Sequence, residues 1–174
     1  MAPPRTIYDL LSNFPQGRGL AVSLPDHKID GFKPSIQAVY NSENVLWLPE
    51  DITRSETWKH INEWLGNDKA NLVMERAIAG LTYLPVNKNV LGTLVSKIWN
   101  KVDSNGGILL LETPASTRLA DEKIDINSWL NSLRTSGLDA RYDPGDPTSH
   151  RPMLQSGKIM ITRTPASPQI LPSI

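Results

Sequence analysis

The sequence predicts a three-layer α/β sandwich built on a mostly parallel sheet. Short apolar runs alternate with amphipathic segments along the chain. Residues 69–116 have the pattern strand, loop, helix, Gly-Gly turn and strand, which is typical of a parallel βαβ unit. The long polar stretch before residues 158–163 would suit a hairpin that adds an antiparallel strand at the edge of the sheet.

Length and composition narrow the class of protein. The 174 residues suit one domain, over residues 1–163, followed by a proline-rich tail over 164–174. Eighteen basic and eighteen acidic residues cancel, so no overall field attracts nucleic acid or anionic membrane. The absence of cysteine excludes disulfides and thiolate metal sites. The start of the chain lacks a signal-peptide pattern and no apolar run is long enough to span a membrane, so we expect a cytoplasmic protein.

Local patterns place the individual elements. Expected helices cover residues 5–13, 34–40, 54–65, 87–102 and 125–136, and expected strands cover 20–24, 45–48, 71–74, 108–111, 138–142 and 158–163. Thr53 to Glu56 matches a capping box, and Gly66 and Gly137 are placed to end helices. Four tryptophans occupy inward helix positions and are expected in the core: Trp58, Trp64, Trp99 and Trp129.

Acidic residues follow three of the expected strands. In open α/β sheets ligands bind beyond the carboxyl ends of the strands. Glu75 and Glu112, at two such ends, would as a functional pair share a proton or hold a metal. As structural residues they would be solvated strand ends, with Arg76 beside Glu75, and this interpretation is favoured. Asp51 likewise suits the positive end of the following helix.

Several chemistries lack their motifs. The sequence has no phosphate-binding loop, no Gly-x-Gly-x-x-Gly and no Gly-x-Ser-x-Gly. Its three histidines, His27, His60 and His150, are not at metal-ligand spacing, so no metal site is predicted. These patterns speak against nucleotide hydrolysis, dinucleotide chemistry and serine hydrolysis.

Several segments together resemble a known enzyme family. The Gly-Gly turn and strand over residues 105–111 resemble the corresponding part of S-adenosylmethionine-dependent methyltransferases. FtsJ-like RNA ribose methyltransferases are the nearest subgroup, with similar segments at residues 1–4 (MAPP), 17–25, 45–53 (VLWLPEDIT), 149–152 and 157–163. The resemblance implies a Rossmann-like, methyltransferase-type fold. It also implies an abbreviated N-terminus, because the strand that precedes the cofactor loop would lie before Met1.

The resemblance carries expectations about a cofactor site. Asp51 matches the acid that contacts the adenine of S-adenosylmethionine. If residues 20–24 are instead the first strand, Glu50 and Asp51 stand where such enzymes hold a ribose. Pro4 and Arg5 replace the glycines that let the family's backbone approach the cofactor.

The catalytic set of the family is altered. FtsJ-like enzymes use Lys-Asp-Lys-Glu around the ribose 2′-hydroxyl. By position Glu75 replaces the aspartate and Glu112 replaces the central lysine, while residues 158–163 contain no acid for the last place. A carboxylate cannot take over the role of a lysine, because its charge has the opposite sign.

Two hypotheses follow. The favoured one is a pseudo-enzyme, a methyltransferase-like domain without catalysis or cofactor that acts by binding a protein, an RNA, or a second subunit in a homo- or hetero-oligomer. The alternative is an active S-adenosylmethionine-dependent methyltransferase with an unusual cofactor loop. In that version Asp51 and Glu50 hold the cofactor, and Glu75 or Glu112 orients or deprotonates the acceptor.

Overall fold

The computed structural model describes residues 11–14, 16–22, 43–75, 88–112, 125–146, 148 and 157–173. The chain divides into two compact units, Met1–Gly66 and Asn67–Ile174, which are described separately. The helix expected over 34–40 and most of the one expected over 5–13 lie outside the described residues. The single domain over 1–163 stays a prediction.

The first unit is built on two parallel strands and one helix. Strand β1 (Gly19–Val22) pairs with β2 (Val45–Leu48), and helix α3 (Ser55–Leu65) follows. Apolar side chains of β2 and α3 form its buried core: Val45, Trp47, Leu48, Trp58 and Ile61. Gly66 ends α3 at a φ of 61°, which favours glycine, so this predicted helix end is confirmed.

Trp64 corrects the expectation that four helical tryptophans lie in the core. Its side chain is only half-buried. The Arg18 guanidinium lies 4.4 Å from the centre of its ring, and Arg18 Nη2 donates to the Trp64 carbonyl at 2.6 Å. Arg18 thus brings its positive charge to a free carbonyl in the last turn of α3, where the helix dipole favours a cation.

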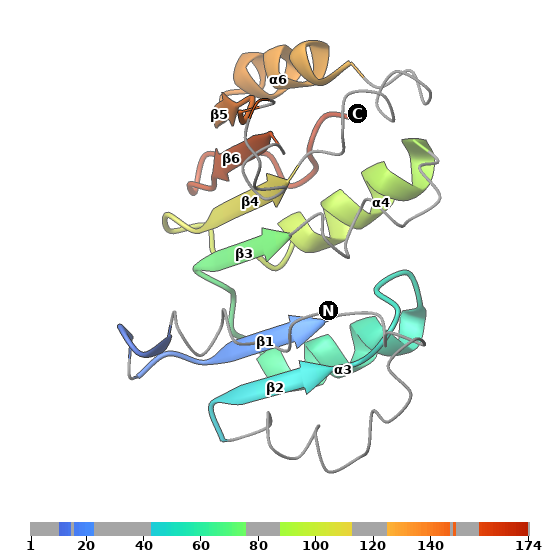
Figure 1. Ribbon diagram of the computed structural model, residues 1–174, viewed down its shortest axis with the longest axis vertical. Helices are drawn as coiled ribbons and strands as arrows, with labels where there is room; N and C mark the ends of the chain where they lie inside the picture. Colours follow the sequence, from blue (N-terminus) through green and yellow to red (C-terminus); the bar gives the residue numbers. More distant parts are fainter. Residues whose placement is uncertain are drawn as a thin grey trace. The chain divides into compact units, whose positions relative to one another are not determined.

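The second unit contains a four-stranded sheet. Its elements are β3 (Leu72–Glu75), α4 (Lys88–Trp99), β4 (Ile108–Glu112), α6 (Ile126–Thr135), β5 (Asp139–Asp143) and β6 (Lys158–Thr162). The strand order is β3-β4-β6-β5 (Figure 1). Strands β3 and β4 pair in parallel on either side of α4, so the predicted βαβ unit is confirmed.

The sequence suggested that the antiparallel strand lies at the edge of the sheet, and the structure corrects this. Strand β6 pairs antiparallel with both β4 and β5, and β5 forms the edge. The sequences of the two strands explain this order. In β6 (KIMIT) Ile159 and Ile161 are buried, whereas β5 (DARYD) exposes charged side chains, which suit an edge. The sheet is therefore mixed.

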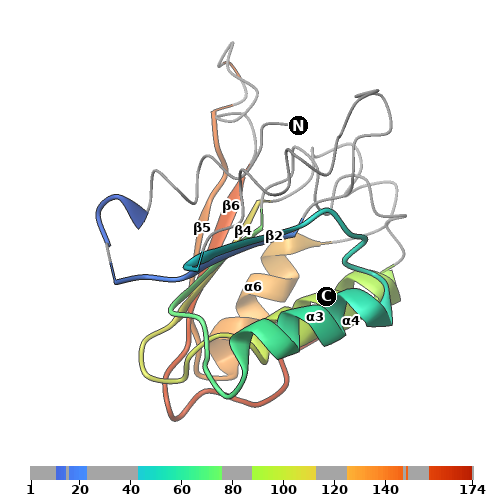
Figure 2. The same ribbon diagram turned by 90° about the horizontal axis from the view of Figure 1, so that it is seen from below.

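Helices α4 and α6 lie on the same side of this sheet (Figure 2). The buried residues of the helices are Leu94, Val95, Ile98, Trp99, Trp129, Leu130 and Leu133, and those of β4 and β6 include Leu109, Leu111, Ile159 and Ile161. Among the described residues of this unit, no helix covers the other side, where Leu72 and Met74 are exposed. The third layer of the predicted sandwich stays a prediction.

The ends of α6 follow the sequence signals. Asp125 precedes its first residue and accepts hydrogen bonds from the amides of Asn127 and Ser128, at 3.0 and 3.1 Å. These bonds, together with one from the Ser128 hydroxyl, lower the pKa of Asp125. Gly137 follows the helix at a φ of 85°. The predicted limits of this helix are confirmed.

Both glycines of the Gly-Gly turn are required where they stand. Gly106 has a φ of 100°, which L side chains rarely adopt. A Cβ on Gly107 would lie 2.5 Å from the Asp103 carbonyl oxygen, so a side chain does not fit. The turn is tied to the end of β6, because Gly106 N donates to the Arg163 carbonyl and Arg163 N donates to the Gly107 carbonyl.

Arg163 is buried where β6, the Gly-Gly turn and the end of α4 meet. Its Nη1 donates to the carbonyls of Trp99 and Val102, at 2.6 and 2.9 Å. Its guanidinium lies 4.9 Å from the centre of the Trp99 ring. The buried cation thus donates to two carbonyls at and just beyond the end of the helix, where the helix dipole favours positive charge, and the Trp99 carbonyl also accepts from Val102 N at 3.1 Å.

Residues 164–173, here called the C-terminal segment, form neither helix nor strand, as their prolines predicted. They are nevertheless packed against the second unit. Trp99 Nε1 donates to the Pro168 carbonyl at 3.0 Å, and Trp129 Nε1 donates to the Pro172 carbonyl at 2.9 Å. Leu171 is buried as well.

We expect Arg163→Met to lower the free energy of unfolding by roughly 2–4 kcal/mol, because two buried carbonyls lose a charged donor. Arg141→Met on β5 is the matched control. Arg141 is exposed and forms an ion pair with Asp139, which is exposed as well, so its loss should cost less than about 0.5 kcal/mol. Urea denaturation of both variants makes the comparison, and equal effects would contradict the role given to Arg163.

Candidate functional site

Glu50 and Asp51 follow the carboxyl end of β2, separated from it by Pro49. This is the strand end at which the sequence placed a cofactor. Both residues belong to the connection that leads into α3. The contacts of each carboxylate therefore decide whether it can serve a ligand.

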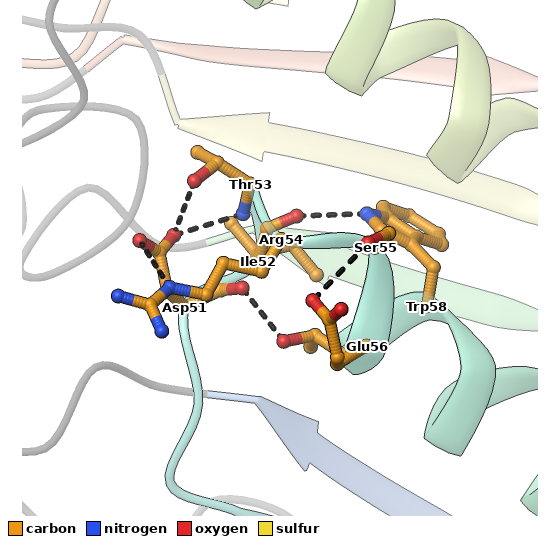
Figure 3. Close-up of polar contacts among 8 residues, drawn as sticks. Asp51, Ile52, Thr53, Arg54, Ser55, Glu56 and Trp58 are labelled. Carbon is orange, nitrogen blue, oxygen red and sulfur yellow. Dashed lines mark hydrogen bonds and ion pairs between the residues drawn. The ribbon is translucent and has the colours of Figure 1, made fainter.

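Asp51 is bound to the start of α3 (Figure 3). Its Oδ1 accepts from Thr53 N at 2.9 Å and from Thr53 Oγ1 at 2.7 Å, and its Oδ2 lies 3.9 Å from Arg54 Nε. Its main-chain carbonyl accepts from Thr57 Oγ1 at 2.7 Å. The two hydrogen bonds from Thr53 lower the pKa of Asp51, and the charge of Arg54 adds to this against a smaller opposing effect of burial.

The capping box predicted at Thr53 does not form. The residue before the first helical residue is Arg54, and its side chain caps nothing. The Thr53 hydroxyl donates to Asp51, and Glu56 accepts from Ser55 Oγ at 3.1 Å (Figure 3). A cap at Thr53 would need its hydroxyl oxygen to accept a main-chain N–H of the first turn, but the helix begins at Ser55 with Arg54 directly before it, and Thr53 instead bonds to Asp51 in the entry to the helix.

Glu50 is held by His60 of α3. Since a carboxylate only accepts, His60 Nδ1 donates to Glu50 Oε1, at 2.8 Å. The His60 side chain is otherwise exposed to solvent. Among the described residues, the buried Glu50 Oε2 has no hydrogen-bond partner. One oxygen of Glu50 therefore remains able to accept a donor from a ligand.

The register of the second unit corrects the expected pairing of Glu75 with Glu112. Glu75, the last residue of β3, is aligned with Leu111, and Glu112, the last residue of β4, is aligned with Lys158. Glu112 is 6% exposed, so it is not the solvated strand end that the sequence favoured. The assignment of either glutamate as catalytic stays a prediction.

Lys158 is a residue that sequence reasoning missed. It is the first residue of β6, is half-buried, and stands directly opposite Glu112 in the antiparallel ladder. Directly opposed residues in such a ladder have neighbouring side chains on one face of the sheet. The opposite charges at 112 and 158 were the available signal, but the register needed to connect them is not local in sequence.

The described residues contain neither a membrane-spanning helix nor a cluster of metal ligands. None of their helices is both long enough and apolar enough to cross a bilayer. No three His, Asp or Glu side chains in the described part of the chain come together in a way that could hold a metal ion.

Comparison with known proteins gives a likeness at the level of fold. No protein-family model matches the sequence, and no curated protein matches it significantly. The N-methyltransferase NodS from Bradyrhizobium japonicum WM9 is similar in structure, with a TM-score of 0.47 and 11% identity over 92% of this chain and 96% of that one.

Two further solved structures are similar. SMU.1697c from Streptococcus mutans, a proposed methyltransferase in complex with SAH, has a TM-score of 0.47 and 14% identity over 83% of this chain and 75% of that one. A proposed ribosomal RNA methyltransferase from Plasmodium falciparum has a TM-score of 0.40 and 8% identity over 94% and 97%. The α/β fold thus resembles that of methyltransferases, and at these values the likeness says nothing about activity.

Replacing Asp51 by Asn should give a pH-dependent loss of stability. The pKa of Asp51 is lowered in the folded state, so at pH values above its ordinary pKa near 3.8 the charged carboxylate stabilises the fold. This contribution is lost as the pH falls through the folded-state pKa. The difference in unfolding free energy between wild type and Asp51→Asn should therefore be constant near neutrality and shrink in acid. Thr53→Val should move this transition to higher pH. A difference that does not vary with pH would contradict the assignment.

Proposed function

We propose that this chain is a methyltransferase-like domain that has lost catalysis and acts by binding a protein or RNA partner. The observation that carries the proposal is that the Asp51 carboxylate is already engaged in contacts with neighbouring residues. The carboxylate at the position of the family's adenine-contacting acid accepts two hydrogen bonds from Thr53 and lies near Arg54. A cofactor amine would have to compete with these local donors, which already fix the start of α3.

The charges at the ends of β4 and β6 support the same proposal. The FtsJ-like set would place a lysine at 112 and an acid within 158–163. Here Glu112 is buried and Lys158 is opposite it, so the two charges are reversed relative to that set. Glu112 bears a negative charge when ionised, so it cannot lower the pKa of a neighbouring lysine as a second cation would. A lysine base of the FtsJ-like kind is therefore not supplied at position 112.

The second candidate is an active S-adenosylmethionine-dependent methyltransferase, and Glu50 favours it. Its buried Oε2 without a partner, beyond the carboxyl end of β2, is the kind of acceptor that a ribose hydroxyl satisfies. In this candidate Glu50 holds the cofactor ribose, and Glu75 or Glu112 orients the methyl acceptor. The bond to His60 would then position the Glu50 carboxylate.

Calorimetric titration with S-adenosylmethionine and with S-adenosylhomocysteine separates the two candidates. The proposal predicts no binding heat up to millimolar cofactor. Binding that Glu50→Gln or Asp51→Ala abolishes would overturn it in favour of the active enzyme. Glu63→Gln is the control, because Glu63 is an exposed residue of α3 whose carboxylate lies 3.8 Å from Lys59 Nζ.

The partner is tested on the same preparation by sedimentation velocity, with and without labelled single-stranded RNA at two salt concentrations. We expect either a complex of the chain with itself or co-sedimentation of RNA that weakens as salt rises. A chain that stays monomeric, leaves RNA free and captures no protein would contradict the binding role.

A further inference from the structure

The C-terminal segment is held by two tryptophan side chains from different helices. Trp99 on α4 donates its indole N–H to the Pro168 carbonyl, and Trp129 on α6 donates to the Pro172 carbonyl. Trp99 is fully buried and Trp129 is 3% exposed. An indole N–H can only donate, so a buried tryptophan requires an acceptor, and here the segment supplies both.

Some side chains of the C-terminal segment are buried and others face solvent. Leu171 is 5% exposed, whereas Ile170 beside it is 73% exposed and Gln169 also faces solvent. Pro168 and Pro172, four residues apart, supply the two acceptor carbonyls. The contact is therefore made by the pattern Pro-x-x-Leu-Pro over residues 168–172.

These features are those of peptide recognition. Extended proline-containing peptides lack internal hydrogen bonds, so their carbonyls are free to accept, and they bind aromatic-lined surfaces at a low entropy cost. The two indole donors come from different helices, α4 and α6. A turn in which Ser167 N donates to the Thr164 carbonyl, at 2.9 Å, separates the contact from β6.

We propose that α4 and α6 form a binding site for extended peptides of the pattern Pro-x-x-Leu-Pro, which the C-terminal segment occupies as an internal ligand. A peptide of this pattern on another polypeptide binds there when the segment is released. This site lies on the helical side of the second unit and does not depend on the proposed function. Release leaves two indole donors and the place of Leu171 free for the incoming peptide.

The attached segment competes with any separate peptide for the site, so its effective concentration sets how much peptide is needed for binding. A short tether gives an effective concentration of roughly millimolar, so a peptide in solution competes poorly with the attached segment. Weakening the segment by Leu171→Asp should remove this competition, because a carboxylate in the place of Leu171 would be buried without a partner.

The test uses the full chain and a fluorescent peptide with the sequence of residues 164–174. We expect the peptide to bind the Leu171→Asp chain about 100-fold more tightly than wild type, since the internal competitor is weakened. Adding Trp129→Phe to that chain should weaken binding about fivefold to tenfold through the loss of one hydrogen bond. A peptide with Asp in place of its leucine is the matched control and should not bind.

A Leu171→Asp chain that keeps its circular dichroism spectrum but leaves the peptide unbound at about millimolar concentration, the range of the internal competitor, would overturn the proposal. If this variant does not fold, isotope-labelled wild type replaces it. Excess unlabelled peptide, at roughly ten times the effective concentration of the tether, should then move the signals of Ile170 and Leu171 to random-coil positions. Signals that stay unchanged would equally overturn it.

Discussion

The structure of the second unit depends on the buried guanidinium of Arg163. The main chain at this residue holds the Gly-Gly turn against the end of β6, and the side chain binds carbonyls at the end of α4. The guanidinium also lies against Trp99, whose indole binds the C-terminal segment. A charge is costly to bury unless its donors are satisfied, and among the described residues Arg163 Nε is buried without a partner, so the arrangement depends on the two bonds that Nη1 makes.

A charged group in a folded chain needs partners, and this explains why acidic residues at strand ends are weak evidence for catalysis in this chain. Asp51 fixes the entry to α3, and Glu50 is joined to His60 on that helix. Glu112 is buried opposite Lys158. These carboxylates thus make contacts within their own unit, and among the described residues the second oxygen of Glu50 has no partner. Under the proposed function, a methyltransferase-like framework persists after its catalytic groups have taken on structural functions.

Local signals in the sequence were sufficient for most of the elements. The Gly-Gly turn and the ends of α3 at Gly66 and of α6 at Gly137 depend on neighbouring residues, and all three are confirmed. The interior place of β6, the opposition of Lys158 to Glu112 and the docking of the C-terminal segment depend on residues distant in sequence, so periodicity could not supply them. The capping box at Thr53 failed as a prediction because α3 begins at Ser55, with Arg54 and not Thr53 directly before it.

The central claim is that the framework of a methyltransferase is present without its reaction. Incubating the full chain with methyl-labelled S-adenosylmethionine and a mixture of RNA, protein and small-molecule acceptors tests it most directly, with an active methyltransferase as positive control. We predict no transfer of label above background. Transfer that is lost on Glu112→Gln or Asp51→Ala would contradict the claim and make this chain an enzyme.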